Sequence, residues 1–236
     1  MLQRSRGDAD NAPLSVFDVK TGELLHIFRD FKYQVHAFLF DGKLVLSMGQ
    51  DGVQIVNAES GKKLRNLKHP LGSKISVIAT GNKMPVMAIG TDEGSLFLAQ
   101  ADDVSTPIRT MGHVHNGAII VAAFSSDDRL MVTGGADGLI GLFDVQTSMA
   151  IGTPWPAHKR AVTAISMSAD GRLVASGSVD GTVRIWDAVA GQPVTHALVG
   201  HTRPVHAVTF DPLSGDLLSY GGDGGELRRW KISGVN

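Results

Sequence analysis

The chain contains no cysteine among its 236 residues. This absence excludes disulfide bonds, thiolate metal ligands and a cysteine nucleophile. Aromatic residues are scarce at 6%, and the 22 Lys and Arg residues nearly balance the 23 Asp and Glu residues. Because the overall charge is so close to zero, the chain has no electrostatic footprint for nucleic acid or for an anionic membrane, and we expect neither as a partner.

Long hydrophobic runs are also missing. No apolar stretch approaches the ~20 residues that a bilayer-spanning helix needs, and the polar N-terminus lacks the apolar core of a signal peptide. We therefore expect a soluble, cytoplasmic protein in which residues 1–12 form a flexible polar tail. Hydrophobic residues still make up 43% of the chain, which is enough for a sizeable core.

Internal repetition is the strongest signal in the sequence. In each of six units, a short apolar run ends in an apolar or aromatic residue followed by one further residue, namely Asp18, Asn57, Gln100, Asp144, Asp187 and Lys231. These positions are 39, 43, 44, 43 and 44 residues apart, in or next to the ~40–45-residue period of a four-stranded propeller blade. A generic β-sandwich or barrel also has many short strands, but it lacks such self-similarity.

Residues 158–200 show the pattern within one unit most clearly. The strand-like runs VTAISM, LVAS, TVRIWD and PVTHALV alternate with the turns SADGR, GSVDG and AVAGQ. Asp suits these turns because it bonds its own downstream backbone, and Gly because it tolerates positive φ. The sequence thus predicts an all-β propeller of four-stranded antiparallel blades, with a domain over 13–236 divided into partial unit 13–29, full units 30–68, 69–112, 113–157 and 158–200, and partial unit 201–236.

These residues resemble the WD-repeat β-propeller family, whose blades run from a Gly-His pair to a Trp-Asp pair. The resemblance rests on GSVDGTVRIWD, on Ala157-His158, and on the Gly-His pairs at 112–113 and 200–201. It covers residues 14–236 and is strongest from residue 113 onward.

Several positions depart from the family pattern. Phe143, Ala99 and Val56 stand where the family has Trp, and Lys231 follows Trp230 where Asp is usual. The resemblance still implies a WD-repeat fold, but it implies units of unequal stability.

Three residues in the fifth unit, His158, Ser176 and Asp180, supply the residue types of a hydrolase triad. The same types recur in two other units, as His113, Thr133 and Asp137 and as His201, Ser219 and Asp223. An enzyme needs one nucleophile in one cleft, whereas a structural device is copied into each blade. We therefore expect no catalytic residues.

Together with Trp186, the triad-like set resembles the structural tetrad of the family. An indole N–H donates to Ser, the Ser hydroxyl donates to His, and His donates to Asp, so every member is satisfied. Trp230 completes the last set in the same way, while Phe143 leaves the fourth unit one bond short. The remaining histidines lack metal-ligand spacing and no phosphate loop occurs, so we expect no metal and no cofactor.

The number of blades stays open at this stage. The repeat gives two strands in the first unit, four in each of the next four and three in the last, which is 21 strands in all. The chain is then a piece of a longer protein that supplies the missing strands, or ELLHIF completes the last unit and closes a five-bladed ring, or two copies pair their open edges. Seven-bladed rings are the commonest form in the family that the chain resembles.

The fold alone implies binding, because blades are rigid and their loops vary. We expect a non-catalytic scaffold for a protein or an acidic peptide, serving as the sensor or interaction module of a larger protein. The predicted contact residues that come just after the histidine of a late unit are His115, Asn116, Lys159, Arg160 and Arg203; Trp155, in the TPWPAH loop, is expected on the same face. The alternatives are a propeller enzyme that uses a central channel and a nucleic-acid scaffold.

Overall fold

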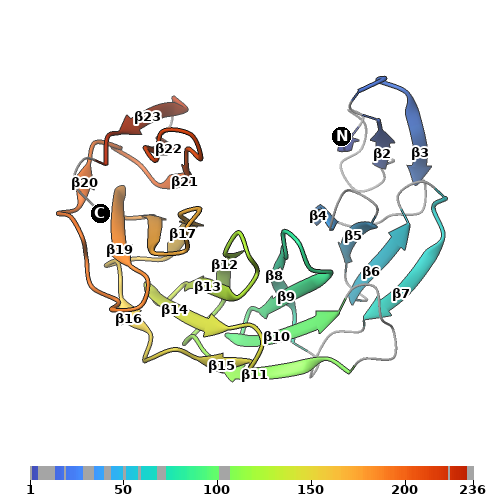
Figure 1. Ribbon diagram of the computed structural model, residues 1–236, viewed down its shortest axis with the longest axis horizontal. Coiled ribbons are helices and arrows are strands. Elements are labelled where there is room, and N and C mark those ends of the chain that lie inside the picture. The colour runs from blue at the N-terminus through green and yellow to red at the C-terminus, as the bar shows by residue number, and fades with distance from the viewer. Residues whose placement is uncertain are drawn as a thin grey trace.

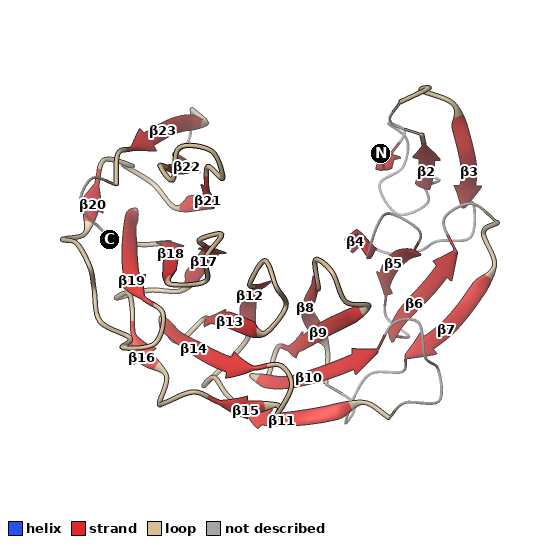
Figure 2. Ribbon diagram, in the orientation of Figure 1, coloured by secondary structure: helices blue, strands red, loops and turns tan. Residues whose placement is uncertain are grey.

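The computed structural model describes residues 2–4, 14–18, 20–28, 35–39, 44–49, 52–57, 60–67, 73–100, 107–222 and 224–232. All regular structure in these residues is β-strand, and the strands form six antiparallel sheets (Figure 2). The predicted all-β architecture of four-stranded propeller blades is confirmed.

The six sheets follow one another along the chain. The first two consist of β1 (Leu2–Arg4), β2 (Leu14–Phe17) and β3 (Leu24–Phe28), and of β4 (Val35–Leu39), β5 (Leu44–Gly49), β6 (Gly52–Asn57) and β7 (Lys63–Leu67). The third consists of β8 (Ile75–Thr80), β9 (Val86–Thr91), β10 (Ser95–Gln100) and β11 (Arg109–His113). The fourth consists of β12 (Ile119–Phe124), β13 (Leu130–Gly135), β14 (Leu139–Asp144), β15 (Met149–Ala150) and β16 (Trp155–Pro156). The last two consist of β17 (Val162–Met167), β18 (Leu173–Ser178), β19 (Thr182–Asp187) and β20 (Leu198–Val199), and of β21 (Val205–Phe210), β22 (Leu217–Gly221) and β23 (Glu226–Trp230).

The sheets are arranged as an open arc and not as a closed ring (Figure 1). The first strands of the last five sheets, β4, β8, β12, β17 and β21, line the inner side of the arc (Figure 1). Each of these strands pairs with the next strand of the same sheet, so every sheet is a meander that runs outward from the centre. In the fourth sheet the outermost strand is divided, because β15 and β16 both pair with β14.

Two expectations about the ends of the arc are corrected. Leu2–Arg4 was expected to lie in the tail, but it pairs with Leu14–Val16 because the edge of β2 offers free backbone donors and acceptors; residues 5–12 lie outside the described residues. The segment that was considered as a fourth strand for the last sheet pairs instead with β2, as β3. Among the described residues, β23 pairs with β22 alone.

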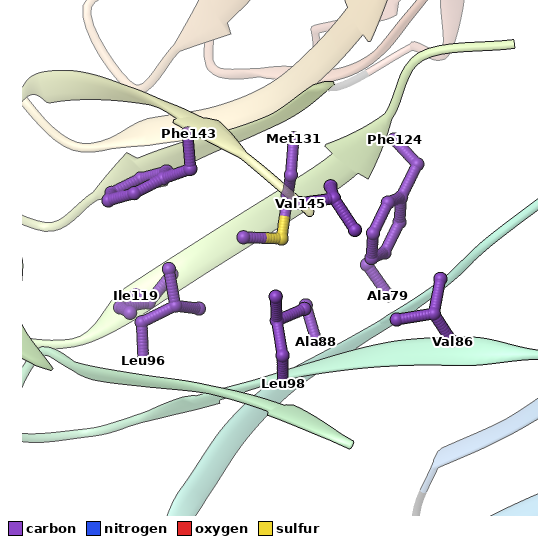
Figure 3. Close-up of a cluster of buried hydrophobic side chains, with 10 residues drawn as sticks. All are labelled: Ala79, Val86, Ala88, Leu96, Leu98, Ile119, Phe124, Met131, Phe143 and Val145. Atoms are coloured by element: carbon purple, nitrogen blue, oxygen red, sulfur yellow. The ribbon is translucent and has the colours of Figure 1, made fainter. Parts of the chain in front are cut away.

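Neighbouring sheets are held together by buried apolar side chains. Between the third and fourth sheets, Met131 and Phe143 from one side and Leu96 and Leu98 from the other belong to one fully enclosed cluster (Figure 3). Similar clusters join the fourth sheet to the fifth and the fifth to the sixth. Burial of this apolar surface is the main driving force that joins the blades.

A repeated glycine in the second strand of the sheet sets the distance to the next sheet. A Cβ atom added at Gly90, Gly134 or Gly177 would lie 2.9, 2.6 or 2.5 Å from the nearest side-chain carbon of the next sheet. Those carbons belong to Ile119, Val162 and Val205, in the first strands β12, β17 and β21. Because real Cβ atoms do not approach so closely, only glycine allows this packing.

A buried carboxylate clamps the third sheet to the fourth. Asp128, fully buried and at a φ of 59°, accepts backbone hydrogen bonds from Asn82 (2.6 Å), Lys83 (2.6 Å) and Met84 (2.7 Å). These three donors lie in the turn between β8 and β9 of the neighbouring sheet. Hydrogen bonds to an ionised acceptor are stronger than neutral ones, so this clamp is a strong tie between two blades.

We predict that Asp128→Ala lowers the free energy of unfolding by about 2–3 kcal/mol, because it leaves three backbone donors without an acceptor. The adjacent Asp127 provides the control: its carboxylate bonds only to Ser125 and Arg129, within its own turn. Asp127→Ala is expected to cost less than about 1 kcal/mol. Urea denaturation of the two variants measures the difference, and equal losses would contradict the clamp.

Candidate binding face and buried histidine networks

The clearest polar network lies in the fifth sheet. The Trp186 indole donates to the Ser176 hydroxyl over 2.9 Å, and that hydroxyl lies 2.8 Å from His158 Nε2. On its other side, His158 Nδ1 lies 3.3 Å from the Asp180 carboxylate and 3.1 Å from the Thr182 hydroxyl. The predicted chain of Trp, Ser, His and Asp is therefore present, with Thr182 as an additional member.

The network specifies how its protons are arranged. Since the carboxylate accepts, His158 Nδ1 carries the proton, and Nε2 accepts from the Ser176 hydroxyl. Burial lowers the pKa of His158, and the opposing effect of Asp180 does not reverse this shift. Burial also raises the pKa of Asp180, but hydrogen bonds from Thr182 outweigh it and the net shift is downward. A neutral imidazole beside an ionised carboxylate results.

The fourth sheet has the same network, but with a different histidine from the one predicted. His115, 2% exposed, places Nε2 at 2.8 Å from the Thr133 hydroxyl and Nδ1 at 3.0 Å from Asp137. His113 was predicted for this role and is instead exposed at the end of β11. His115 was predicted to contact a partner, and its burial corrects that assignment. Phe143 supplies no indole donor, as expected from the sequence.

The spacing of the sequence contains the signal that identifies His115. In all three networks the histidine lies 18 residues before its hydroxyl partner. The Gly-His pair at 112–113 drew attention to the wrong residue, because β11 continues through both of its members. The network histidine of this unit lies two residues after the Gly-His pair, so that His115, and not His113, lies between Thr133 and Asp137.

The sixth sheet carries a third network. His201 Nε2 lies 2.7 Å from the Ser219 hydroxyl, to which the Trp230 indole donates over 2.8 Å. His201 Nδ1 is buried and has no partner among the described residues. The predicted fourth member, Asp223, lies outside the described residues.

Trp155 does not belong to the exposed face for which it was predicted. It is only 9% exposed, lies in β16 opposite Ile140, and packs against Trp186 with 6.4 Å between ring centroids. The physical reason is that Trp155 belongs to the outermost strand of its sheet, which comes just before the histidine loop. Leu198 in β20 has the same position before His201. An apolar side chain at this position covers the sheet. The sequence signal for an inward position was that Trp155 and Leu198 each lie three residues before the histidine of the next unit.

The other predicted contact residues do lie at the same end of the strands, on one face of the arc. We define the loop face as the end formed by loops 114–118, 157–161 and 201–204, each of which leads into the first strand of a sheet. Asn116, Lys159, Arg160 and Arg203 are all exposed there. The three loops are held to the adjacent turns: Asn116 N donates to Asp137 (2.8 Å), Lys159 N donates to Asp180 (3.3 Å), and the Pro204 carbonyl accepts from Gly222 N (3.2 Å).

The described residues include no group of three or more His, Asp or Glu side chains that could hold a metal ion. In the same part of the chain no helix is long and apolar enough to cross a membrane. Internal hydrogen bonds join the His115, His158 and His201 imidazoles to the hydroxyls of Thr133, Ser176 and Ser219, and this arrangement ties each histidine loop to the second strand of its sheet.

Comparison with known proteins gives matches of two kinds. Residues 105–144 and 150–187 match the family model described as WD domain, G-beta repeat. The crystal structure of the computationally designed Ika8 protein has 25% sequence identity and a TM-score of 0.76, over 100% of this chain and 71% of that one. No curated protein sequence matches the chain. The two matched segments contain the His115 and His158 networks.

We predict that Asp180→Ala lowers the free energy of unfolding by about 1–3 kcal/mol, because it leaves the buried His158 N–H without its carboxylate. Asp187→Ala is the control, since that exposed carboxylate bonds only to the backbone of Val189 and Ala190. Its cost should stay below about 1 kcal/mol. A melting temperature of Asp180→Ala that equals the wild type would rule out the structural role of the network.

The three buried histidines predict a loss of stability in mild acid. Burial lowers the pKa of His115, His158 and His201 in the folded protein, so at pH values just below the ordinary histidine value near 6.5 the unfolded chain binds more protons. Stability is therefore full above pH 6.5 and declines as the pH falls from there toward the folded pKa values.

Urea titrations between pH 8 and pH 5 measure this decline. His196→Gln is the control, because His196 is exposed and belongs to none of the three networks. A free energy of unfolding that stays constant from pH 7 to pH 5.5 is incompatible with the prediction.

Proposed function

The chain belongs to the WD-repeat family, and from this premise we propose that it is a non-catalytic scaffold that binds an acidic peptide segment of another protein on its loop face. WD repeats generally mediate protein interactions. The repeated His158-type networks favour a structural role for residues that otherwise resemble a hydrolase triad. The proposal therefore assigns binding, and not chemistry, to this face.

The observation that carries the proposal is the exposure of three cations on two neighbouring loops, Lys159 and Arg160 on one and Arg203 on the other. Two carboxylates beside these loops point inward, since the side chains of Asp137 and Asp180 are only 10% and 13% exposed and each bonds a histidine. Within loops 157–161 and 201–204 themselves, the exposed charged side chains are all cations. Guanidinium groups bind carboxylate and phosphate in a bidentate manner, which favours an acidic or phosphorylated ligand.

The loops also present their cations from a rigid base. The His158 loop is bonded to its turn through both the imidazole and Lys159 N. In addition, the Arg160 carbonyl lies against Gly138, and the Arg203 carbonyl against Gly181, each in the turn of the preceding sheet. Little backbone ordering remains to be done on binding, which lowers the entropic cost of association.

The site proposed here is smaller and more polar than the sequence suggested, because Trp155 and His115 are buried. Without an aromatic anchor, electrostatic attraction supplies more of the affinity, and binding should weaken as salt concentration rises. We also propose a cytoplasmic location, which the distribution of a fluorescent fusion of the chain tests.

We predict that Arg160→Glu with Arg203→Glu weakens the binding of a fluorescein-labelled phosphoserine- and glutamate-rich peptide at least tenfold, a change of about 1.4 kcal/mol. Fluorescence anisotropy in low salt gives the affinity. The matched control is Arg129→Glu with Arg172→Glu, which makes the same charge change at exposed positions beyond the opposite end of the strands.

Both double variants should keep the wild-type melting temperature within a few degrees, since surface changes usually cost less than about 0.5 kcal/mol each. Equal loss of peptide affinity in the two double variants would show that net charge, and not the loop face, determines binding. Retained affinity in the first variant would place the contacts elsewhere.

A further inference from the structure

A groove of about 710 Å³ opens at the end of the strands opposite to the loop face, between the fifth and sixth sheets. It lies between the turn that joins β17 to β18, residues 168–172, and the turn that joins β21 to β22, residues 211–216. These turns follow the first strands of their sheets, whereas the loop face precedes them. Six-residue strands separate the two ends by about 20 Å.

This junction differs from the two before it. Between the third and fourth sheets, the Asp128 carboxylate bonds the neighbouring turn. Between the fourth and fifth sheets, the Ser126 hydroxyl donates to the Ala169 carbonyl over 2.6 Å. No hydrogen bond joins turn 168–172 to turn 211–216, although both turns lie wholly within the described residues. The space that direct bonds close at the other junctions is open here.

The groove combines an apolar wall with two carboxylates. Its apolar side chains include Met167, Leu173, Phe210 and Ile232, all partly exposed. Leu213, which lies between two lining residues of the second turn, is 96% exposed and extends the apolar surface beyond the groove. A volume of this size accommodates one or two side chains of a partner.

One carboxylate comes from each turn, Asp170 from the fifth sheet and Asp211 from the sixth. The Ser168 hydroxyl is the main cause that lowers the pKa of Asp170, and the Ser214 hydroxyl is the main cause that lowers that of Asp211. Arg172 and Arg229 also lie near these groups, but neither lines the groove, and Arg229 bonds Asp216 at 2.7 Å. The lining therefore holds two negative charges and no Lys or Arg.

We propose that this groove binds an extended peptide segment of another protein in which a lysine or arginine lies next to an apolar residue. The apolar side chain packs against Met167 and Phe210, and the cation lies between the carboxylates of Asp170 and Asp211. The ligand is thus opposite in charge to the one assigned to the loop face. The groove does not depend on that assignment, because it rests on different residues at the other end of the strands.

Methyl NMR of the protein, titrated with the acetylated peptide Lys-Leu-Arg-Leu-Lys, tests the proposal. The Met167 and Ile232 methyl signals should shift and saturate, while that of Met149, exposed on the fourth sheet, should not. Asp170→Asn with Asp211→Asn should weaken binding at least tenfold.

The matched control is Asp127→Asn with Asp144→Asn, which removes the same charge from turns with the same kinds of hydrogen bond: Ser125 bonds Asp127 as Ser168 bonds Asp170, and Thr147 bonds Asp144 as Ser214 bonds Asp211. A second variant, Thr209→Trp, fills the groove without removing a carboxylate and should also abolish the methyl shifts. It keeps the test decisive if the double variant fails to fold.

Three results would overturn the proposal. If Glu-Leu-Glu-Leu-Glu shifts the same methyl signals with equal affinity, the groove adsorbs apolar side chains without selecting a cation. If the control pair weakens binding as much as the groove pair, the two carboxylates have no specific role. If the Met167 and Ile232 signals shift with protein concentration alone, and sedimentation shows a dimer, a second copy of the chain occupies the groove.

Discussion

The close approach between the second strand of one sheet and the first strand of the next is the constraint on which the arc depends. Gly90, Gly134 and Gly177 leave no space for a Cβ atom, and the branched side chains of the next sheet fill the space that remains. This contact sets the separation between sheets along the arc. The buried clusters and the clamp at Asp128 both form at distances that it determines.

The two ends of the strands differ in how their polar groups are used. At the loop face, the carboxylates of Asp137 and Asp180 turn inward and bond histidines and backbone N–H groups. At the opposite end, carboxylates such as Asp170 lie in exposed turns and bond only their own turn.

The architecture could be predicted from the sequence because equivalent residues recur at a regular spacing along the chain. They recur every 39 to 44 residues, and each repeat must fold in the same way to cover its neighbour. Side-chain assignments were less secure, since they depend on small shifts within a repeat. The histidine of the fourth sheet lies two residues beyond the Gly-His pair, and Trp155 packs inward because its strand, absent from the sequence prediction of that loop, pairs with β14. The clamp at Asp128 could not be predicted at all, because it joins a buried acceptor to a turn 44 to 46 residues away that has no sequence signature.

The meander topology has a kinetic consequence. Every strand except β16 pairs with a neighbour in sequence, so each sheet can form largely by local closure without waiting for a distant part of the chain. Contacts between sheets then join units that are already consecutive. Folding of such an arrangement can begin in any of several sheets and spread in both directions, as in other repeat architectures. The fifth sheet has the most complete polar network, around Trp186 and Ser176, and is the natural place for folding to begin.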